Sequence, residues 1–343
     1  MVMRMVRFGL YLVGVTLLLT GSAIGQAPAT TLRVGLVASV SDAGFFVPME
    51  RGYFAEQGLA IEFVPFRSAA DMIAPLGVGQ LDVGGGAVSA GLFNAMARGV
   101  DLRIVADKGT IRTGQSYEAL IIRRDLVESG RFKTLADLKG LRIGLAARGI
   151  SPHIDLVMFA QKANLRPDDV EITIMAFPDM VPAMANKALD GALLIEPFRT
   201  QALEQQIGVF IESADKIYPD HQVAVVLYAP HMRREKVDAG RKFMVAYLQG
   251  VRDFNDAFIK KQPEKKQQVI GALAKFTPVK DFALYEKMVM PWLDPDGTVN
   301  RQSLRFDQEW YAQNGFVSTK VNLSLVVDDR FVLYALQRLG RYR

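Results

Sequence analysis

The sequence contains no cysteine. Disulfide bonds, thiolate metal sites and cysteine nucleophiles are therefore excluded, and so is a lipid anchor on a cysteine after a signal peptide. Histidines are scarce as well: His153, His221 and His231 are the only three, and they stand far apart from one another and near no paired carboxylates. We therefore expect no metal site, no cofactor and no set of catalytic residues.

The chain also has little net charge. Its 41 basic and 36 acidic residues give +5 over 343 residues, and removing Arg4 and Arg7 leaves +3. No basic stripe interleaved with aromatic residues is present, so the composition indicates no nucleic-acid partner. Half of the residues are hydrophobic, which is enough for two packed cores in a chain of this length.

Only one long apolar run is present, at the N-terminus. Arg4 and Arg7 precede an uncharged stretch over 8–20, and small residues follow over 21–29. This order predicts a secretory signal peptide at 1–25, because the run is shorter than the roughly 20 residues that span a bilayer. An uncleaved anchor is the alternative. We expect a periplasmic protein with no stable membrane insertion once the signal has been removed.

A weak internal repeat indicates two similar halves. The segments at 32–36, 71–73 and 81–82 return at 141–145, 179–181 and 189–190, at offsets of 108 or 109 residues. Short apolar strands alternate with helices in both halves, which predicts mostly parallel sheets flanked by helices. We expect an α/β protein with lobe 1 at 30–115 plus 225–343, including a helical C-terminal region, and lobe 2 at 116–224. Two crossings between the lobes predict a hinge, and a cleft where strand ends meet.

Four motifs carry a family resemblance: GYFAEQGL at 52–59, GQLDVG at 79–84, LADLKGLRIG at 135–144 and EPF at 196–198. They resemble those of periplasmic binding proteins of the nitrate, sulfonate, taurine and thiamine-pyrimidine-precursor group of ABC transporters. The resemblance covers the whole mature chain. It implies a two-lobed periplasmic-binding-protein fold of type II, whose lobes close on a ligand. It also implies a monomer that delivers its ligand to an ABC transporter permease and ATPase.

The resemblance places ligand contacts in the loops that follow strand ends. Serine hydroxyls and a carboxylate offer hydrogen bonds, and the glycines at 84–86 are interpreted as opening a helix whose N-terminus favours an anion. These glycines could equally mark only a tight strand-to-helix turn. Ser151 fits a helix N-cap with proline at the next position. The aromatics could instead belong to the core, His153 could cap a helix at the surface, and Glu196 could be a structural acid. The candidates are Ser39, Ser41, Asp42, Phe45, Phe66, Ser68, Gly85, Gly86, Ala87, Tyr117, Ser151, His153 and Glu196.

These features predict a receptor that catalyses nothing and binds a small organic anion or a flat heterocycle. Sulfonate, taurine, nitrate, carboxylate and pyrimidine ligands all stay open. One alternative is a binding protein that docks on a sensor, because its sequence would look the same. Another is an enzyme on the same fold, such as a thiamine-precursor synthase or a menaquinone-pathway dehydratase. The absence of cysteine argues against the first of these enzymes, and the signal sequence argues against the second.

Overall fold

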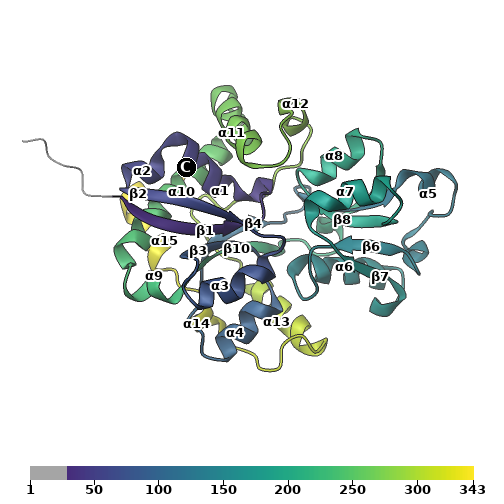
Figure 1. Cartoon of the computed structure of the whole chain (residues 1–343), viewed down its shortest axis with the longest axis horizontal. Helices are drawn as coiled ribbons and strands as arrows, with labels where there is room; N and C mark the ends of the chain where they lie inside the picture. Colours follow the sequence, from purple (N-terminus) through teal and green to yellow (C-terminus); the bar gives the residue numbers. More distant parts are fainter. Residues whose placement is uncertain (1–28) are drawn as a thin grey trace, which may run out of the picture.

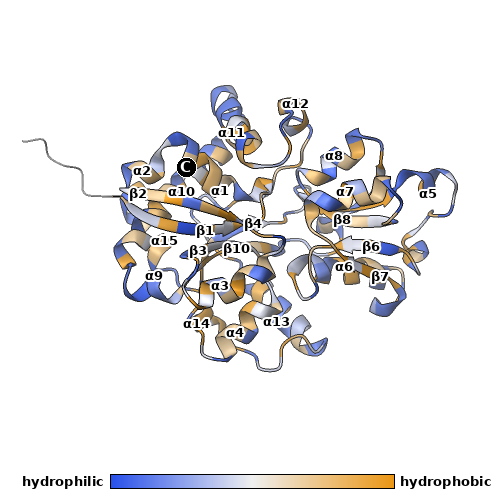
Figure 2. Cartoon of the chain, viewed as in Figure 1, coloured by the Kyte–Doolittle hydropathy of each residue, from blue (hydrophilic) through white to orange (hydrophobic). Residues whose placement is uncertain are grey.

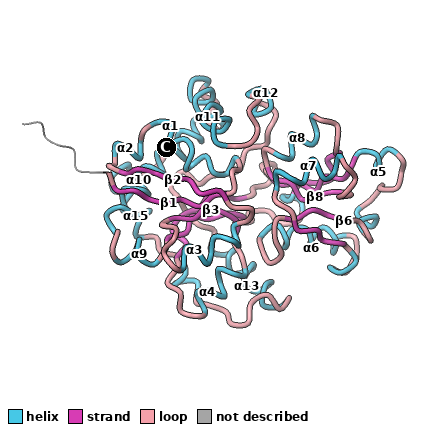
Figure 3. Tube along the Cα trace, viewed as in Figure 1, coloured by secondary structure: helices cyan, strands magenta, loops and turns pink. Residues whose placement is uncertain are grey.

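The computed structural model describes residues 29–343, so the expected signal peptide at 1–25 lies outside the described residues. The strands form two five-stranded sheets. In Figures 1 and 3 the sheets lie at opposite ends of the molecule, with loops between them. We call the first sheet with its helices lobe 1 and the second sheet with its helices lobe 2. No helix among residues 29–343 combines the length and the apolar character needed to cross a membrane.

The sheet of lobe 1 has the strand order β2-β1-β3-β10-β4. β1, β2 and β3 pair in parallel, whereas β10 lies antiparallel between β3 and β4. Because β10 follows lobe 2 in the chain, its first residue, Gln222, falls three residues before the expected boundary at 225. The strands are β1 (Thr30–Leu36), β2 (Leu59–Pro65), β3 (Val83–Ala87), β4 (Arg103–Thr110) and β10 (Gln222–Tyr228).

The sheet of lobe 2 repeats this arrangement with the order β7-β6-β8-β5-β9. β6, β7 and β8 pair in parallel, and β5 lies antiparallel between β8 and β9. The predicted α/β class with mostly parallel sheets is therefore confirmed, with one reversed strand in each sheet. The strands are β5 (Glu118–Arg123), β6 (Arg142–Leu145), β7 (Glu171–Ile174), β8 (Gly191–Ile195) and β9 (Gly208–Ser213).

Helices cover both sheets (Figure 1). Those of the N-terminal part of lobe 1 are α1 (Ala43–Arg51), α2 (Tyr53–Glu56), α3 (Ile73–Gly77) and α4 (Ala90–Ala97). Those of lobe 2 are α5 (Arg124–Glu128), α6 (Ser151–Lys162), α7 (Phe177–Ala185) and α8 (Phe198–Glu204). The C-terminal region adds α9 (Pro230–Arg234), α10 (Val237–Phe258), α11 (Pro263–Phe276), α12 (Phe282–Tyr285), α13 (Arg301–Gln313), α14 (Leu323–Val326) and α15 (Arg330–Leu339).

The internal repeat has a structural cause in two aspartates. The Asp82 carboxylate accepts the backbone N–H of Arg33 at 2.8 Å, and the Asp190 carboxylate accepts that of Arg142 at 3.0 Å. The backbone N–H of each aspartate donates in return to the carbonyl of the same arginine. Each aspartate–arginine pair holds the start of one strand against its parallel neighbour: β3 against β1 in lobe 1, and β8 against β6 in lobe 2. The repeated Leu-Asp pattern therefore marks equivalent strand starts in the two lobes.

Hydrophobic residues concentrate in the strands and on the helix faces that cover them (Figure 2). Every residue of β5, β8 and β10 is buried. These strands read as continuous apolar runs in the sequence because helices cover both faces of each sheet. The C-terminal helices α10, α11 and α15 complete this packing against lobe 1, since α10 packs on α1, α11 and α15.

Two segments cross between the lobes, at 111–117 after β4 and at 214–221 before β10. They are joined where the N–H of Ile111 donates to the carbonyl of His221 at 2.9 Å. The sequence predicts the crossings in the apolar runs at 117–122 and 222–228, but these runs largely coincide with the strands β5 and β10. The sequence also predicts a helix at 281–292, which is largely wrong, because only Phe282–Tyr285 is helical there.

Candidate functional site

An enclosed cavity lies between the lobes, at the carboxyl ends of the parallel strands of both sheets. Strand ends of open α/β sheets are the usual ligand sites. The cavity leaves about 30 Å³ for the centre of a water-sized sphere, room for one or two waters. The lobes are thus nearly closed on it, and a larger solute requires them to separate at the hinge. The walls of the cavity are Val37, Ser39, Ser41, Ser68, Ala69, Gly86, Ala87, Lys108, Tyr117, Ala146, Ile150, Pro152, Phe177, Ile195, Val223 and Ala224.

The polar wall on the lobe 1 side is built around Lys108, a residue that sequence reasoning missed. Its Nζ lies 2.9 Å from Asp42 Oδ1 and donates to Ser41 Oγ at 3.0 Å. Ser39 Oγ lies 2.8 Å from Ser41 Oγ, and the backbone N–H of Ser39 donates to Asp42 Oδ2 at 2.9 Å. All four residues are buried. The turn after β1 thus holds two hydroxyls and an ion pair in one fixed arrangement.

Two further hydroxyls reach the cavity. Ser68 accepts the N–H of Ala70 at 3.1 Å, which leaves its own hydroxyl proton free to donate. Tyr117 is 1% exposed and lines the cavity, and its hydroxyl makes no hydrogen bond to any residue of the chain from 29 to 343. A buried hydroxyl ordinarily has a partner, so both groups are placed to bind a solute.

The glycines at 84–86 lie in the strand β3, and the interpretation that they open a helix is wrong. The following helix, α4, begins at Ala90 and is capped by Ser89, whose Oγ accepts the N–H of Leu92 at 3.2 Å. A Cβ on Gly85 would lie 2.3 Å from Phe45 Cε2 and 2.7 Å from Lys108 Cε. Replacing Gly85 would therefore disturb core packing and would not isolate ligand binding. Gly86 and Ala87 do line the cavity.

Both phenylalanine candidates lie outside the cavity wall. Phe45 is buried, with its ring centroid 5.5 Å from that of Tyr247 and 6.0 Å from that of Phe243. Phe66 is partly buried and packs against a hydrophobic cluster that includes Leu76 and Leu81. The phenylalanine that does line the cavity is Phe177, at the start of α7 in lobe 2.

Ser151 connects the lobes. Its N–H donates to the carbonyl of Val88 at 2.9 Å, and its hydroxyl reaches the carbonyls of Val88 and Val223 at 3.1 and 2.9 Å. The N-cap of α6 is Ile150, so Ser151 is the first helical residue and the predicted capping role is wrong. A further bond runs from the N–H of Ala90 to the carbonyl of Gly149 at 2.8 Å. These bonds fasten the start of α6 to lobe 1 in the closed arrangement.

His153 also faces lobe 1 and does not line the cavity. It is 4% exposed and packs edge-on against Trp310 and Phe316, with ring centroids 5.5 and 5.4 Å away. Its Nδ1 accepts the N–H of Gly149 at 3.1 Å. Burial, with a smaller contribution from the charge of Arg148, lowers the pKa of His153 to about 4. The ring is therefore neutral in this contact at neutral pH.

Glu196 is buried and lies outside the cavity wall. Its carboxylate accepts the N–H and the hydroxyl of Thr200 at 3.0 and 2.8 Å, and the N–H of Val289 at 3.2 Å. Its backbone carbonyl accepts the N–H of Val40 of lobe 1 at 3.3 Å. Burial raises the pKa of Glu196 despite these donors. Through these contacts Glu196 holds the end of β8 against α8 and against lobe 1, which is a structural role.

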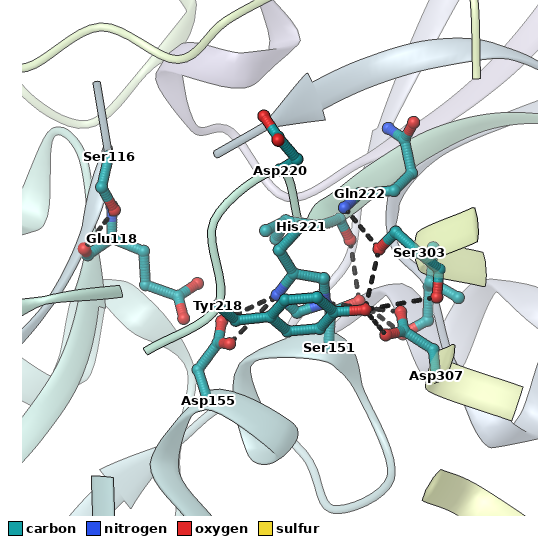
Figure 4. Close-up of polar contacts among 12 residues, drawn as sticks. Ser116, Glu118, Ser151, Asp155, Tyr218, Asp220, His221, Gln222, Ser303 and Asp307 are labelled. Atoms are coloured by element: carbon teal, nitrogen blue, oxygen red, sulfur yellow. Dashed lines mark hydrogen bonds and ion pairs between the residues drawn. The ribbon is translucent and has the colours of Figure 1, made fainter. Parts of the chain in front are cut away.

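A buried ionic cluster sits at the hinge (Figure 4). His221 Nδ1 lies 3.0 Å from Asp155 of α6, and Nε2 lies 3.3 Å from Asp307 of α13. The ring of Tyr218 stacks on the imidazole at a centroid distance of 4.0 Å, and its hydroxyl donates to Asp307 at 3.1 Å. Burial alone would lower the pKa of His221, but the two carboxylates outweigh it and raise that pKa to about 10. A charged imidazole thus joins lobe 2, the hinge and the C-terminal region.

Glu118 extends this cluster on the lobe 2 side. It is fully buried, and neither oxygen of its carboxyl group has a hydrogen-bond partner among residues 29–343. Burial, followed by the neighbouring carboxylate of Asp155, holds the pKa of Glu118 well above its usual value. The direction has a plain cause, because a second bare carboxylate beside Asp155 would be costly.

A second pocket, about 430 Å³ by the same measure, lies outside the cleft. It is bounded by the crossing segments and the C-terminal region, where the guanidinium of Arg112 lies 3.6 Å above the ring of Trp292. Of the strand residues only Thr110, the last of β4, lines it, and the sheet of lobe 2 contributes none. We therefore assign the primary site to the cavity between the lobes, which takes residues from both sheets. Within residues 29–343 no group of three or more His, Asp or Glu side chains is arranged to hold a metal ion.

Comparison with known proteins agrees with this geometry. The sequence model of the NMT1-like family matches residues 25–274. A putative binding protein of Brucella abortus is 25% identical over 268 residues, 75% of each chain. The alkanesulfonate-binding protein SsuA from Xanthomonas axonopodis pv. citri, solved with MOPS bound, superposes with a TM-score of 0.71 at 19% identity, over 88% of this chain and 99% of that one. A desulfurization enzyme, DSZB, shares the fold with a TM-score of 0.60 at 14% identity, over 90% of this chain and 99% of that one.

Proposed function

Because the chain belongs to the NMT1-like family, we propose that it is a periplasmic solute-binding receptor of an ABC transporter. It captures a small organic anion or heterocycle between its lobes and delivers it to the permease. The observation that carries this proposal is the enclosed cavity, whose wall takes residues from the strand ends of both sheets. A solute held there contacts both lobes, so its binding energy favours the closed arrangement.

The domain organisation and the processing of the chain belong to the same proposal. Lobe 1 comprises 30–115 plus the chain from 222, where β10 begins, to 343. Lobe 2 comprises 116–221, and the receptor acts as a monomer. Removal of a signal peptide at 1–25 releases it into the periplasm, with a mature N-terminus near Gln26 or Thr30. N-terminal sequencing of protein released by osmotic shock checks this. Recovery of intact Met1 on a membrane-bound chain would contradict it.

The receptor is proposed to catalyse nothing. Ser41 and Lys108 lie 3.0 Å apart, a spacing that nucleophilic catalysis with a lysine base would need. The ammonium, however, is ion-paired with Asp42 at 2.9 Å and so is not free to accept the proton of the serine. Both groups are instead suited to donate hydrogen bonds to a bound solute.

A thermal-shift screen of the mature protein tests the proposal. The panel contains sulfonates, taurine, nitrate, short carboxylates and pyrimidines, and a ligand that binds only the folded chain raises the melting temperature. We expect at least one compound to raise it by several degrees, to bind with one-to-one stoichiometry in calorimetry, and to be recovered unchanged in mass spectrometry. Absence of binding across the panel would overturn the receptor, and conversion of the compound would favour an enzyme.

A further inference from the structure

We propose that Lys108 makes the cleft selective for small organic solutes that carry a single negative charge. This rests on the proposed receptor function and narrows its ligand class. Among the sixteen residues that wall the cavity, Lys108 is the one charged side chain, and no carboxylate is present. The polarity of the wall therefore discriminates against cations, which would find no counter-charge there.

The ion pair presents its positive end to the cavity. Lys108 lines the cavity wall, whereas its partner Asp42 does not. An ammonium group has three N–H donors. One of those on Lys108 is donated to Ser41 Oγ at 3.0 Å. Asp42 Oδ1 lies 2.9 Å from Nζ as an ion pair, but it accepts no hydrogen bond from any described residue. At least one donor therefore remains for a solute, on a side chain that is itself completely buried.

The charge of Asp42 is compensated behind the wall. Its Oδ2 accepts the N–H of Ser39 at 2.9 Å and lies 3.3 Å from the hydroxyl of Ser39. Asp42 also stands at the N-cap position of α1, where the positive end of the helix dipole favours a carboxylate. Asp42 Oδ1 accepts no hydrogen bond from residues 29–343 and has Lys108 as its counter-charge, so the pair is neutral as a whole. The preference for an anion follows from the orientation of the pair, because Lys108 lines the cavity and Asp42 lies behind it.

The remaining donors and walls define the solute further. The hydroxyls of Ser68 and Tyr117 are both free to donate into the same space, and with Lys108 they suit the oxygens of a carboxylate or sulfonate group. Opposite them stand Ile150, Phe177 and Ile195 of lobe 2, which offer contact only to an apolar body. A second negative charge would be buried against these side chains without a partner, which is costly.

The experiment compares solutes of matched length and different charge by calorimetric titration of the mature protein. The probes are butanesulfonate and pentanoate as monoanions, pentanamide as the neutral analogue, glutarate as the dianion and pentylammonium as the cation. We expect both monoanions to bind at least 10-fold more tightly than each of the other three, since a hydrogen bond to a charged group contributes about that factor.

Variants separate a role in selectivity from a role in folding. Lys108→Met should weaken the binding of the monoanions about 10- to 100-fold and change that of pentanamide little. Because this change leaves Asp42 buried without its cation, the double variant Lys108→Met/Asp42→Asn removes both charges and should show the same loss of charge preference. Lys236→Met is the matched control, since this lysine is ion-paired with Asp82 outside the cleft, and it should bind like wild type.

The outcomes separate the inference from the function on which it rests. If pentanamide, glutarate or pentylammonium binds as tightly as the monoanions, the charge selectivity is wrong while the receptor survives. The same conclusion follows if both Lys108 variants keep the wild-type ratio of pentanoate to pentanamide affinity. If none of the probes binds and the screening panel is also silent, the receptor function itself fails.

Discussion

Replacing His221 by Ala is expected to destabilise the protein by about 3–5 kcal/mol, because it removes the cation between two buried carboxylates. Asp155 and Asp307 both contact the imidazole, and all three side chains are fully buried. With the imidazole gone, the carboxylates must either stay charged without a partner or take up protons. Urea unfolding at pH 7, followed through the midpoint and the slope, measures the loss.

His231→Ala is the matched control for this change. His231 is also bound to an aspartate, with its Nε2 2.8 Å from Asp82, but Asp82 keeps Lys236 at 2.7 Å and the N–H of Arg33. We expect His231→Ala to cost no more than about 1 kcal/mol, as partly exposed ion pairs do. In the His221→Ala background, Asp155→Asn should restore part of the stability. Equal losses in the two histidine variants would contradict the assignment of a buried ionic cluster.

The cluster also has a pH signature. The folded-state pKa of His221, about 10, lies above its unfolded value of about 6.5. The folded chain therefore holds one proton more than the unfolded chain between these values. Stability from this group is complete below pH 6.5 and is lost as the pH rises towards 10. This loss on the basic side should be absent in His221→Ala.

Acidification is expected to destabilise the protein through His153, by about 2 kcal/mol between pH 6.5 and pH 5. The folded-state pKa of His153 is lowered to about 4, so in this window the unfolded chain binds a proton that the folded chain excludes. Stability from this group is complete above pH 6.5 and is lost as the pH falls through about 4. Protonation also turns Nδ1 from the acceptor of the Gly149 N–H into a donor facing it.

His153→Phe separates this effect from other titrations. The phenyl ring keeps the packing against Trp310 and Phe316 but cannot take up a proton, so the variant should lose about 2 kcal/mol less than wild type on going from pH 6.5 to pH 5. Burial raises the pKa of Asp107 to about 6, so below that pH this carboxyl group makes the folded protein more stable as the pH falls, opposite to His153. The difference between the variant and wild type removes this contribution, because Asp107 is present in both. An unchanged pH profile in the variant would show that His153 is not the responsible group.

Much of the architecture could be predicted because strand and helix patterns are local. The sequence predicts a strand at 222–228 and a helix at 263–276, and both match the observed bounds. An uninterrupted apolar run, or a proline in the first helical turn, marks such an element without tertiary information. The structure of 281–292 could not be predicted from the local pattern, because most of its residues pack on lobe 1 without forming a helix.

The site was less predictable, because it depends on which side of an element faces the other lobe. Ser151 and His153 were placed at the correct helix start, yet their side chains turn to lobe 1 and not to the cavity. Lys108 was missed because the apolar run that predicts this strand, 102–106, ends at Ala106, whereas β4 continues to Thr110. The one available signal was the Asp107–Lys108 pair at the end of an apolar strand, where a charged residue must find a buried partner.

The position of β10 has a consequence for the order in which the chain can fold during synthesis. The five strands of lobe 2, β5 to β9, are consecutive, so their sheet can assemble from one continuous stretch. Among the strands that the structure describes, β4 pairs only with β10. β10 also pairs with β3, where Ala224 lies opposite Ala87, although all of lobe 2 separates these two residues in the sequence. The sheet of lobe 1 therefore stays incomplete until β10 has been synthesised, and until then the edges of β3 and β4 are unpaired. Such long-range pairing is slow and exposes the nascent chain to aggregation, so we expect chaperone dependence to reside in the lobe that is synthesised first.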